Sequence, residues 1–219
     1  NNTNASRSIT VSAAATYTAT FAINSYTITA TAGTGGTVTG SGSYNYGATA
    51  TLTATPNTGY SFVKWSDNNT NASRSITVSA AATYTATFAI NSYTITATAG
   101  TGGSVTGSGS YNYGATATLT ATPNTGYSFV SWNDGVTTAS RSITVSAAAT
   151  YTATFAINSY TITATAGTGG SVTGSGSYNY GATATLTATP NTGYSFVKWS
   201  DNNTNASRSI TVSAAATYT

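Results

Sequence analysis

Apolar and polar residues alternate one by one along most of this chain. From Tyr26 to Ala32, every second residue is apolar and the residues between are threonines. Because successive side chains of a β-strand point to opposite faces, this alternation is typical of a half-buried strand. Comparable stretches predict further strands at 38–46, 48–54, 60–65, 76–78 and 84–90. No stretch places apolar residues at helical spacing, so the pattern predicts an all-β fold with about six strands between residues 24 and 90.

Residues that favour turns separate the predicted strands. In Pro56–Gly59, proline presets φ and glycine accepts a positive φ, which predicts a tight turn. Gly40 and Gly42 fall inside the stretch 38–46, where they predict a bulge or the close approach of another backbone. The segment Ser66–Arg74 is rich in Asn, Ser and Asp and is expected to be a loop.

The whole pattern recurs with a period of 67 residues, because the segment NSYTITATAGTGG begins at Asn24, Asn91 and Asn158. Self-similarity at such a period is typical of tandem-repeat proteins. We therefore divide the chain into the C-terminal part of a repeat at 1–23, full repeats at 24–90 and 91–157, and a repeat lacking its last few residues at 158–219. A unit this small has a marginal core, so we expect neighbouring repeats to stabilise one another.

The junction between repeats carries a change of parity. Apolar residues fall on odd numbers up to Ile23 and on even numbers from Tyr26 onwards. The buried face must therefore switch at Asn24-Ser25, through a bulge or because the strand leaves one unit and enters the next. No Pro- or Gly-rich linker separates the copies, so we expect stiffly joined β-modules stacked as a rod of roughly 80–100 Å. If the stretch Ile9–Ile23 forms an orphan hairpin, its open edge invites pairing with another strand.

Four motifs follow one another in a constant order along the chain. They are an opening strand into Gly-Gly, Tyr-x-Tyr-Gly before Thr-x-Thr-Leu-Thr-Ala-x-Pro, Gly-Tyr-x-Phe-x-x-Trp, and a closing Thr-x-Thr-Ala-x-Phe strand. This order resembles the divergent internalin-type B-repeat of bacterial surface proteins over essentially the whole chain. The resemblance implies a small, mostly β module, β-grasp-like or sandwich-like, that serves in multiples as a spacer or adhesive stalk. It implies no catalytic residues.

The composition excludes several classes of function. Charged residues make up 4% of the chain, and its six Lys and Arg are spread thinly, so no basic stripe can follow a nucleic-acid backbone. His, Cys and Glu are absent, and the acids Asp67, Asp134 and Asp201 lie one repeat apart. Acid–base catalysis needs His or a pair of carboxylates, and a Ca²⁺ loop needs several acids. A Ser–Lys pair is the remaining nucleophile, but the second copy has Ser131 in place of Lys64. We therefore expect no enzyme, no cofactor and no metal site. No apolar run approaches the ~18 residues that span a bilayer.

Aromatic residues supply the candidate ligand-binding positions. They are Trp65, Trp132, Trp199, Tyr46, Tyr113 and Tyr180. A flat indole face suits a sugar ring, but large aromatics dominate small cores, and we expect the tryptophans to lie there. For the tyrosines, cross-strand packing is the alternative to sugar binding. Rows of threonine hydroxyls resemble the surfaces of some ice-binding proteins, although threonine is also an ordinary strand residue.

The copies differ mainly in one loop. The first and third copies read KWSDNNTNASR, whereas the second reads SWNDGVTTASR at Ser131–Arg141. Substitutions gathered in one loop indicate either a tolerant surface tip or a binding site under diversification.

These observations predict a structural tandem-repeat segment of a secreted or cell-surface protein. Low charge with abundant Thr and Asn favours that location. The segment would act as a stalk or spacer, or as the building block of an extracellular filament. The filament is considered because the few charges on its surface repel other copies only weakly. Self-association would run through neighbouring repeats or strand edges. The alternative is a carbohydrate-binding adhesin module that uses the Trp- and Tyr-rich loop end of each repeat.

Overall fold

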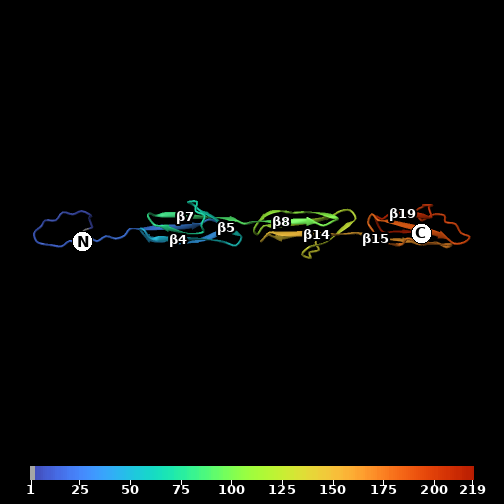
Figure 1. Cartoon of the computed structure of the whole chain (residues 1–219), viewed down its shortest axis with the longest axis horizontal. Coiled ribbons are helices and arrows are strands. Elements are labelled where there is room, and N and C mark those ends of the chain that lie inside the picture. Colours follow the sequence, from blue (N-terminus) through green and yellow to red (C-terminus); the bar gives the residue numbers. More distant parts are fainter. Residues whose placement is uncertain (1–2) are drawn as a thin grey trace. The chain divides into compact units, whose positions relative to one another are not determined.

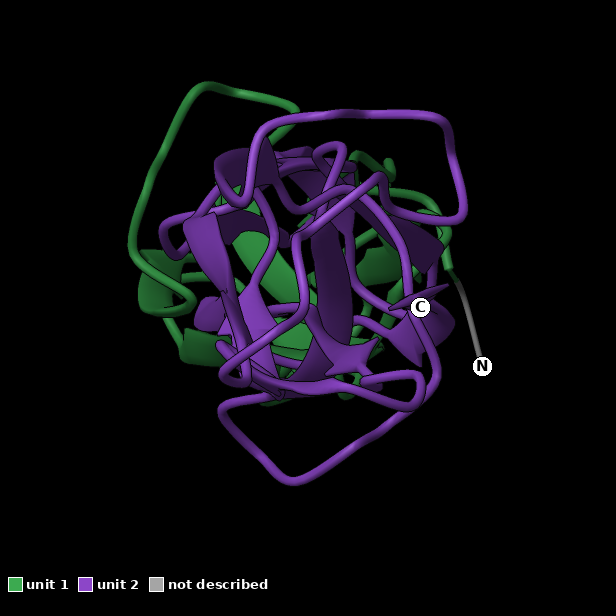
Figure 2. Ribbon diagram, turned by 90° about the vertical axis from the view of Figure 1, so that its right-hand side faces the viewer, with its two compact units in different colours: residues 1–89 green, residues 90–219 purple. Residues whose placement is uncertain are grey.

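Each full repeat folds into two small β-sheets. The computed structural model describes residues 3–219. The regular elements among these residues are all β-strands, which confirms the all-β prediction. The chain divides into two compact units, Asn1–Ala89 and Ile90–Thr219 (Figures 1 and 2). Over residues 3–219, no helix has the length and apolar character needed to cross a membrane.

The first full repeat has seven strands that alternate between the two sheets. They are β1 (Ser25–Ala32), β2 (Gly36–Thr39), β3 (Gly42–Asn45), β4 (Thr49–Pro56), β5 (Tyr60–Trp65), β6 (Ser73–Thr77) and β7 (Ala82–Ile90). The odd-numbered strands form a sheet in the order β3-β1-β7-β5, and the even-numbered strands form a sheet in the order β2-β4-β6. β1 and β7 run parallel, whereas β1 and β3 run antiparallel. Consecutive strands therefore never pair with each other in this repeat.

The second and third repeats follow the same plan. The second contains β8 (Ser92–Ala99), β9 (Gly103–Thr106), β10 (Gly109–Asn112), β11 (Thr116–Pro123), β12 (Tyr127–Trp132), β13 (Ser140–Thr144) and β14 (Ala149–Ile157). The third contains β15 (Ser159–Ala164), β16 (Gly170–Thr173), β17 (Gly176–Asn179), β18 (Thr183–Pro190), β19 (Ser207–Thr211) and β20 (Ala216–Tyr218). Residues 194–199, which correspond to β5 and β12, are not in a strand.

The single strand predicted over 38–46 is in fact two strands in different sheets. The break lies at Gly40, whose φ of +104° belongs to the left-handed region. A Cβ at Gly40 would lie 2.1 Å from the carbonyl oxygen of Thr51, so the close approach of another backbone is present here. The hydroxyl of Ser41 then accepts a hydrogen bond from the backbone N–H of Ala30 at 2.8 Å. This break raises the number of strands above the expected six.

The two sheets of each repeat share one core in a sandwich-like arrangement. Along β4 the buried residues are Ala50, Leu52 and Ala54, which confirms the alternation read from the sequence. The buried core of the first repeat consists of Ile28, Ala50, Leu52, Ala54, Trp65, Val78 and Ala86. The second repeat buries the equivalent residues and adds Phe155, whereas the buried core of the third consists of Ile162, Ala184, Leu186, Trp199 and Val212. Each core draws from both sheets, so neither sheet is stable without the other.

The hairpin considered at Ile9–Ile23 does not form, because no strand is present among residues 3–24. By repeat position, residues 6–10 correspond to β6 and residues 15–23 correspond to β7. In the first full repeat β6 pairs with β4, whereas β7 pairs with β1 in the other sheet. The two segments were never partners of each other, so alone they have no ladder to form. The guanidinium of Arg7 lies over the ring of Tyr17, 4.2 Å from the ring centroid, as the equivalent Arg and Tyr do in the full repeats.

At the junction of the second and third repeats, one residue separates two sheets. β14 ends at Ile157 and belongs to the sheet β10-β8-β14-β12, whereas β15 begins at Ser159 and belongs to the sheet β17-β15-β20. Asn158 therefore marks the point where the chain leaves one module and enters the next, which is the second of the two explanations for the parity switch.

Candidate functional site

The tryptophans lie in the cores. The exposed fractions are 0% for Trp65 and 1% for both Trp132 and Trp199. The indole N–H of Trp65 donates a hydrogen bond to the carbonyl oxygen of Asn71 at 3.0 Å, and the other two tryptophans make the same bond. The ring of Phe62 lies 5.8 Å from that of Trp65 between centroids. Because the indoles are covered by protein, they offer no open face for a sugar ring to stack on.

An Asp–Arg–Tyr cluster ties the variable loop to both sheets. In the first repeat, Nη1 of Arg74 on β6 contacts both carboxylate oxygens of Asp67 in the loop, at 2.6 and 2.7 Å. The same guanidinium lies 5.0 Å from the ring centroid of Tyr84 on β7. The corresponding clusters, Asp134–Arg141–Tyr151 and Asp201–Arg208–Tyr218, repeat this geometry. Each aspartate is thus used in an ion pair. Among residues 3–219, no three His, Cys, Asp or Glu side chains lie together in a group that could hold a metal ion.

The hydrogen bonds from arginine also set the acid response of the aspartates. Hydrogen bonding by Arg74 holds the pKa of the Asp67 carboxyl below its ordinary value of 3.8, and Arg141 and Arg208 act likewise on Asp134 and Asp201. The folded state therefore binds protons less readily than the unfolded state. The stabilisation is complete above the ordinary pKa and is lost as the pH falls through the lower folded value.

We expect the melting temperature to be level between about pH 5 and 7, because no His or Glu titrates there, and to fall below about pH 4. The fall should be modest, since the aspartate side chains are 38–40% exposed and solvent screens the pairs. Circular dichroism melts of the chain and of a variant carrying Asp67→Asn, Asp134→Asn and Asp201→Asn measure this. An equal acid-induced fall in both proteins would contradict the assignment.

The variable loop changes in coupled pairs. In the first repeat, Nζ of Lys64 donates a hydrogen bond to Oδ1 of Asn68 at 2.8 Å. The second repeat replaces both partners, with Ser131 and Gly135. Asn68 has a φ of +67° and Gly135 a φ of +85°, so the substitution keeps a residue that tolerates the left-handed region. The backbone course of the loop constrains its sequence at this position.

A second loop substitution preserves a hydrogen bond. The hydroxyl of Ser66 accepts from the N–H of Thr85 at 3.2 Å, and Oδ1 of Asn133 accepts from the N–H of Thr152 at 3.1 Å. The loop therefore stays fastened to β7 and β14 although its sequence differs. These exchanges fit a structural tip that tolerates change within a fixed frame.

The candidate tyrosines do not share one environment. Tyr46 is 58% exposed, whereas Tyr113 and Tyr180 are half-buried. The ring of Tyr46 lies 6.4 Å from that of Tyr26 between centroids. The ring of Tyr180 instead covers the turn at Gly126 in the preceding repeat, where a Cβ would lie 2.1 Å from a ring carbon. Tyr180 therefore belongs to a contact between repeats.

Asn158 and three other residues form the joint between the second and third repeats. The N–H of Asn158 donates to the carbonyl oxygen of Gly126 at 2.8 Å, and its carbonyl oxygen accepts from the N–H of Tyr180 at 2.8 Å. Its side-chain Oδ1 accepts from the hydroxyl of Ser128 at 2.6 Å. We name Gly126, Ser128, Asn158 and Tyr180 the repeat joint. The parity switch pointed to Asn158, but Ser128 and Gly126 carried no signal that distinguished them from ordinary turn and strand residues.

A comparison with protein families agrees with this architecture. A family model described as the divergent InlB B-repeat domain matches the chain three times, at residues 26–92, 93–159 and 160–219. Among solved structures, one similar chain is described as the Bacillus anthracis TIE protein, with 9% identity and a TM-score of 0.46. That match covers 89% of this chain and 49% of the other, so this chain spans about half the length of that protein. No curated protein matches the chain.

The three matches cover most of the sequence and recur in step with the 67-residue period. They also include the strands, turns and loops described above. The chain therefore belongs to the divergent InlB B-repeat domain family, and it is an all-β array of such repeats.

Proposed function

We propose that this chain is a non-catalytic spacer segment of a secreted or cell-surface protein, in which the repeats hold a fixed mutual geometry. The observation that carries the proposal is the repeat joint. A single residue, Asn158, connects the second and third repeats and takes part in three hydrogen bonds. A linker without free residues, fastened on both sides, leaves few backbone angles to vary. In this proposal the modules are residues 24–90, 91–157 and 158–219.

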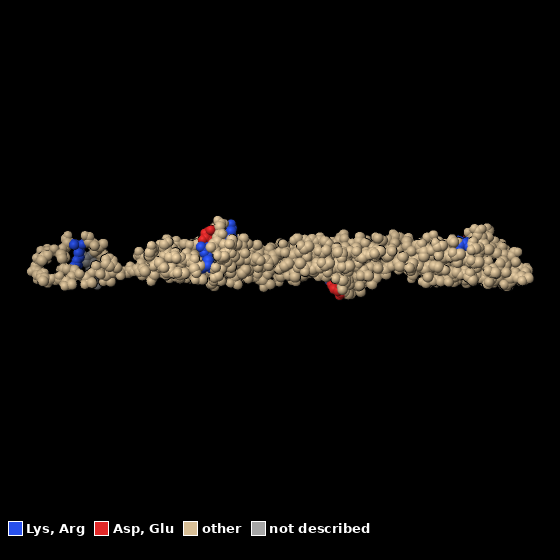
Figure 3. Space-filling view, viewed as in Figure 1, with Lys and Arg blue, Asp and Glu red and all other residues tan. Residues whose placement is uncertain are grey.

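The charged residues of the surface are few and scattered. On the face drawn in Figure 3, charged residues form small patches separated by uncharged surface. The buried tryptophans remove the broadest aromatic faces from contact with ligands. The filament version of the structural role requires a surface through which copies join.

Distance measurements across the joint test the spacer role. The chain has no cysteine, so nitroxide labels on Thr118→Cys and Thr185→Cys, which are exposed and occupy equivalent places in β11 and β18, report on the joint alone. Pulsed electron double resonance should give one narrow distance distribution. A broad distribution in this protein, like that after Gly-Ser-Gly is inserted behind Asn158, would argue against a spacer.

A matched pair of glycine variants extends this test. Gly126→Ala should broaden the label distances, because its methyl group displaces Tyr180. Gly193→Ala is the control: its φ of +85° is close to the +80° of Gly126, and a Cβ there meets nothing within 4 Å. If both variants broaden the distances equally, backbone strain rather than the contact with Tyr180 is responsible.

A further inference from the structure

The first and last strands of each full repeat are parallel neighbours in the middle of one sheet. In the second repeat, β8 and β14 occupy the two central places in the sheet β10-β8-β14-β12. They pair in parallel at five successive positions, residues 95–99 with residues 149–153. In the first repeat, β1 and β7 pair in the same way, residues 28–32 with residues 82–86. The strands through which the chain enters and leaves a repeat therefore lie side by side.

This pairing decides how a repeat responds to a pull along the chain. Because β8 and β14 run in the same direction, the start of β8 and the end of β14 lie at opposite ends of the pair. Tension between Asn91 and Asn158 therefore acts along the strands. The hydrogen bonds of a parallel pair are evenly spaced along the strands, so such a load falls on them together rather than on one at a time. Forced unfolding is governed by the unfolding rate, and a ladder that must break as a unit slows it.

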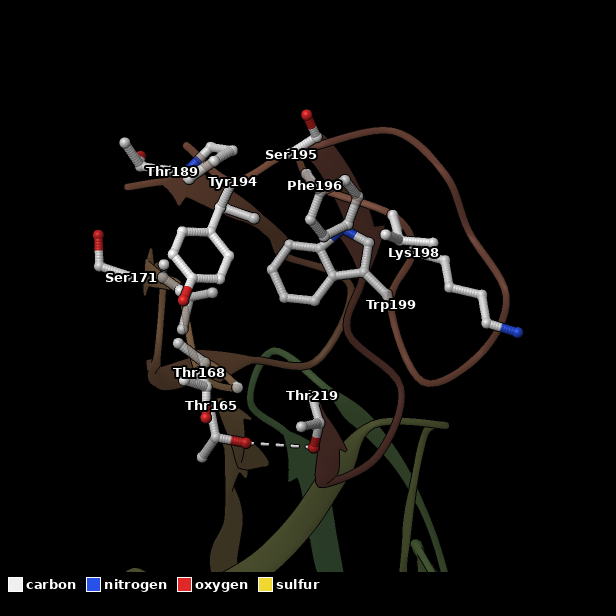
Figure 4. A pocket seen from close by; sticks show the side chains of 18 residues that line it. Thr165, Thr168, Ser171, Thr189, Tyr194, Ser195, Phe196, Lys198, Trp199 and Thr219 are labelled. Carbon is white, nitrogen blue, oxygen red and sulfur yellow. Dashed lines mark hydrogen bonds between the residues drawn. The ribbon is translucent and has the colours of Figure 1, made fainter. Parts of the chain in front are cut away.

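A side-chain hydrogen bond fastens the same two strands. Thr98 and Thr152 are opposite each other in the register, and their hydroxyl oxygens lie 2.7 Å apart and share a hydrogen bond. The equivalent threonines of the first repeat make this bond at 2.7 Å. Figure 4 shows that of the third repeat, between Thr165 and Thr219 at 3.1 Å. The bond therefore bridges the first and last strands in each of the three repeats.

The ladder continues past the end of β8 and lies directly on the core. The N–H of Gly100 donates to the carbonyl oxygen of Ala153 at 2.8 Å. A Cβ on Gly100 would lie 3.0 Å from that oxygen, so glycine allows the two backbones to approach. On the inner face, Ile95 and Ala153 are buried. They exclude water from one side of the ladder, which strengthens its hydrogen bonds.

The segments between β8 and β14 stay outside the path of the load. Residues 100–148 contain the whole sheet β13-β11-β9 and the variable loop Ser131–Arg141. Both points at which tension enters the repeat lie on β8 and β14, so residues 100–148 bear no tension while these two strands remain paired. The loop can therefore differ between copies without weakening a repeat against a pull.

We propose that each full repeat bears tensile load, and that the parallel pair of its first and last strands is the clamp that resists it. The clamp is β1 with β7 in the first repeat and β8 with β14 in the second. At the repeat joint, the single residue Asn158 passes the load from β14 to β15 without slack. The proposal rests on the spacer role and adds resistance to force. The label measurement reports geometry without load, so the two can fail separately.

Two pulling directions on the second repeat test the clamp. The chain has no cysteine, so the handles of an optical trap can be attached to the full chain at chosen pairs of exposed residues. Ser92→Cys with Ala156→Cys gives an opposite-end pull on β8 and β14, whereas Ser92→Cys with Ala148→Cys gives a same-end pull. We expect the opposite-end pull to need a severalfold higher force, because the same-end pull opens the hydrogen bonds one after another.

Matched controls separate the direction of load from folding stability. The urea midpoints of the two double-cysteine variants should agree, since both carry the same fold. Thr98→Val should lower the force of the opposite-end pull, because it removes the hydroxyl bond to Thr152. Thr118→Val, at an exposed place in β11 of the other sheet, should leave that force unchanged. Equal forces in the two pulling directions overturn the proposal, and an equal fall in both valine variants contradicts the part given to the threonine bond.

Discussion

Replacing Trp132 by alanine should lower the unfolding free energy of the second repeat by about 3–5 kcal/mol. Trp132 is 1% exposed and packs within a cluster of only eight buried residues, so its loss leaves a cavity that few neighbours can close. It also removes the indole donor from the carbonyl oxygen of Thr138, at 3.1 Å. A unit of 67 residues has about 3–10 kcal/mol of stability in total. The substitution is therefore expected to unfold the second repeat or bring it close to unfolding.

Urea unfolding followed by circular dichroism measures this loss. Val130→Ala is the matched control, because Val130 lies on the same strand, β12, but is 45% exposed and should change stability little. Trp132→Phe should recover part of the loss by refilling the core. If Trp132→Ala unfolds with the midpoint of the unsubstituted chain, the tryptophan does not support the core.

Gly107→Ala should destabilise the second repeat by about 3 kcal/mol or more, from two sources. Gly107 corresponds to Gly40 and has a φ of +103°, which costs an L-residue about 1–2 kcal/mol. Its Cβ would also lie 2.1 Å from the carbonyl oxygen of Thr118, which belongs to a strand and cannot move alone. The crossing of the chain from β9 to β10 therefore requires glycine.

Gly114→Ala separates these two sources. Gly114 has a φ of +77°, but a Cβ there meets nothing within 4 Å, so the expected loss is only the backbone cost of about 1–2 kcal/mol. Parallel urea titrations of the two variants measure the difference. Equal losses would show that the approach of Thr118 contributes nothing.

The local features of the fold follow from short stretches of sequence. Alternation along β1 and β4 depends only on the two-residue period of a strand, and Ala50, Leu52 and Ala54 are buried as that period requires. The turns form where Pro and Gly occur, because the backbone preferences of these residues suit tight turns. The exact 67-residue recurrence was also enough to predict the repeats and the family resemblance.

Strand pairing could not be derived in the same way, because alternation specifies a face and not a partner. Two strands in different sheets have the same pattern as one long strand, so the split at Gly40 is invisible in the stretch 38–46. The hairpin considered at Ile9–Ile23 does not form for the same reason, since strands next to each other in sequence lie in opposite sheets.

The sites between elements depended on the tertiary structure altogether. Arg74 lies seven residues from Asp67, yet the third member of the cluster, Tyr84, comes from the other sheet. In the repeat joint, Gly126 meets Tyr180 across a boundary between modules. The sequence by itself determined the all-β repeat, because strand faces and turns are local properties. The tertiary structure decided the sheet partners and the repeat joint, because these arise where segments distant in sequence meet.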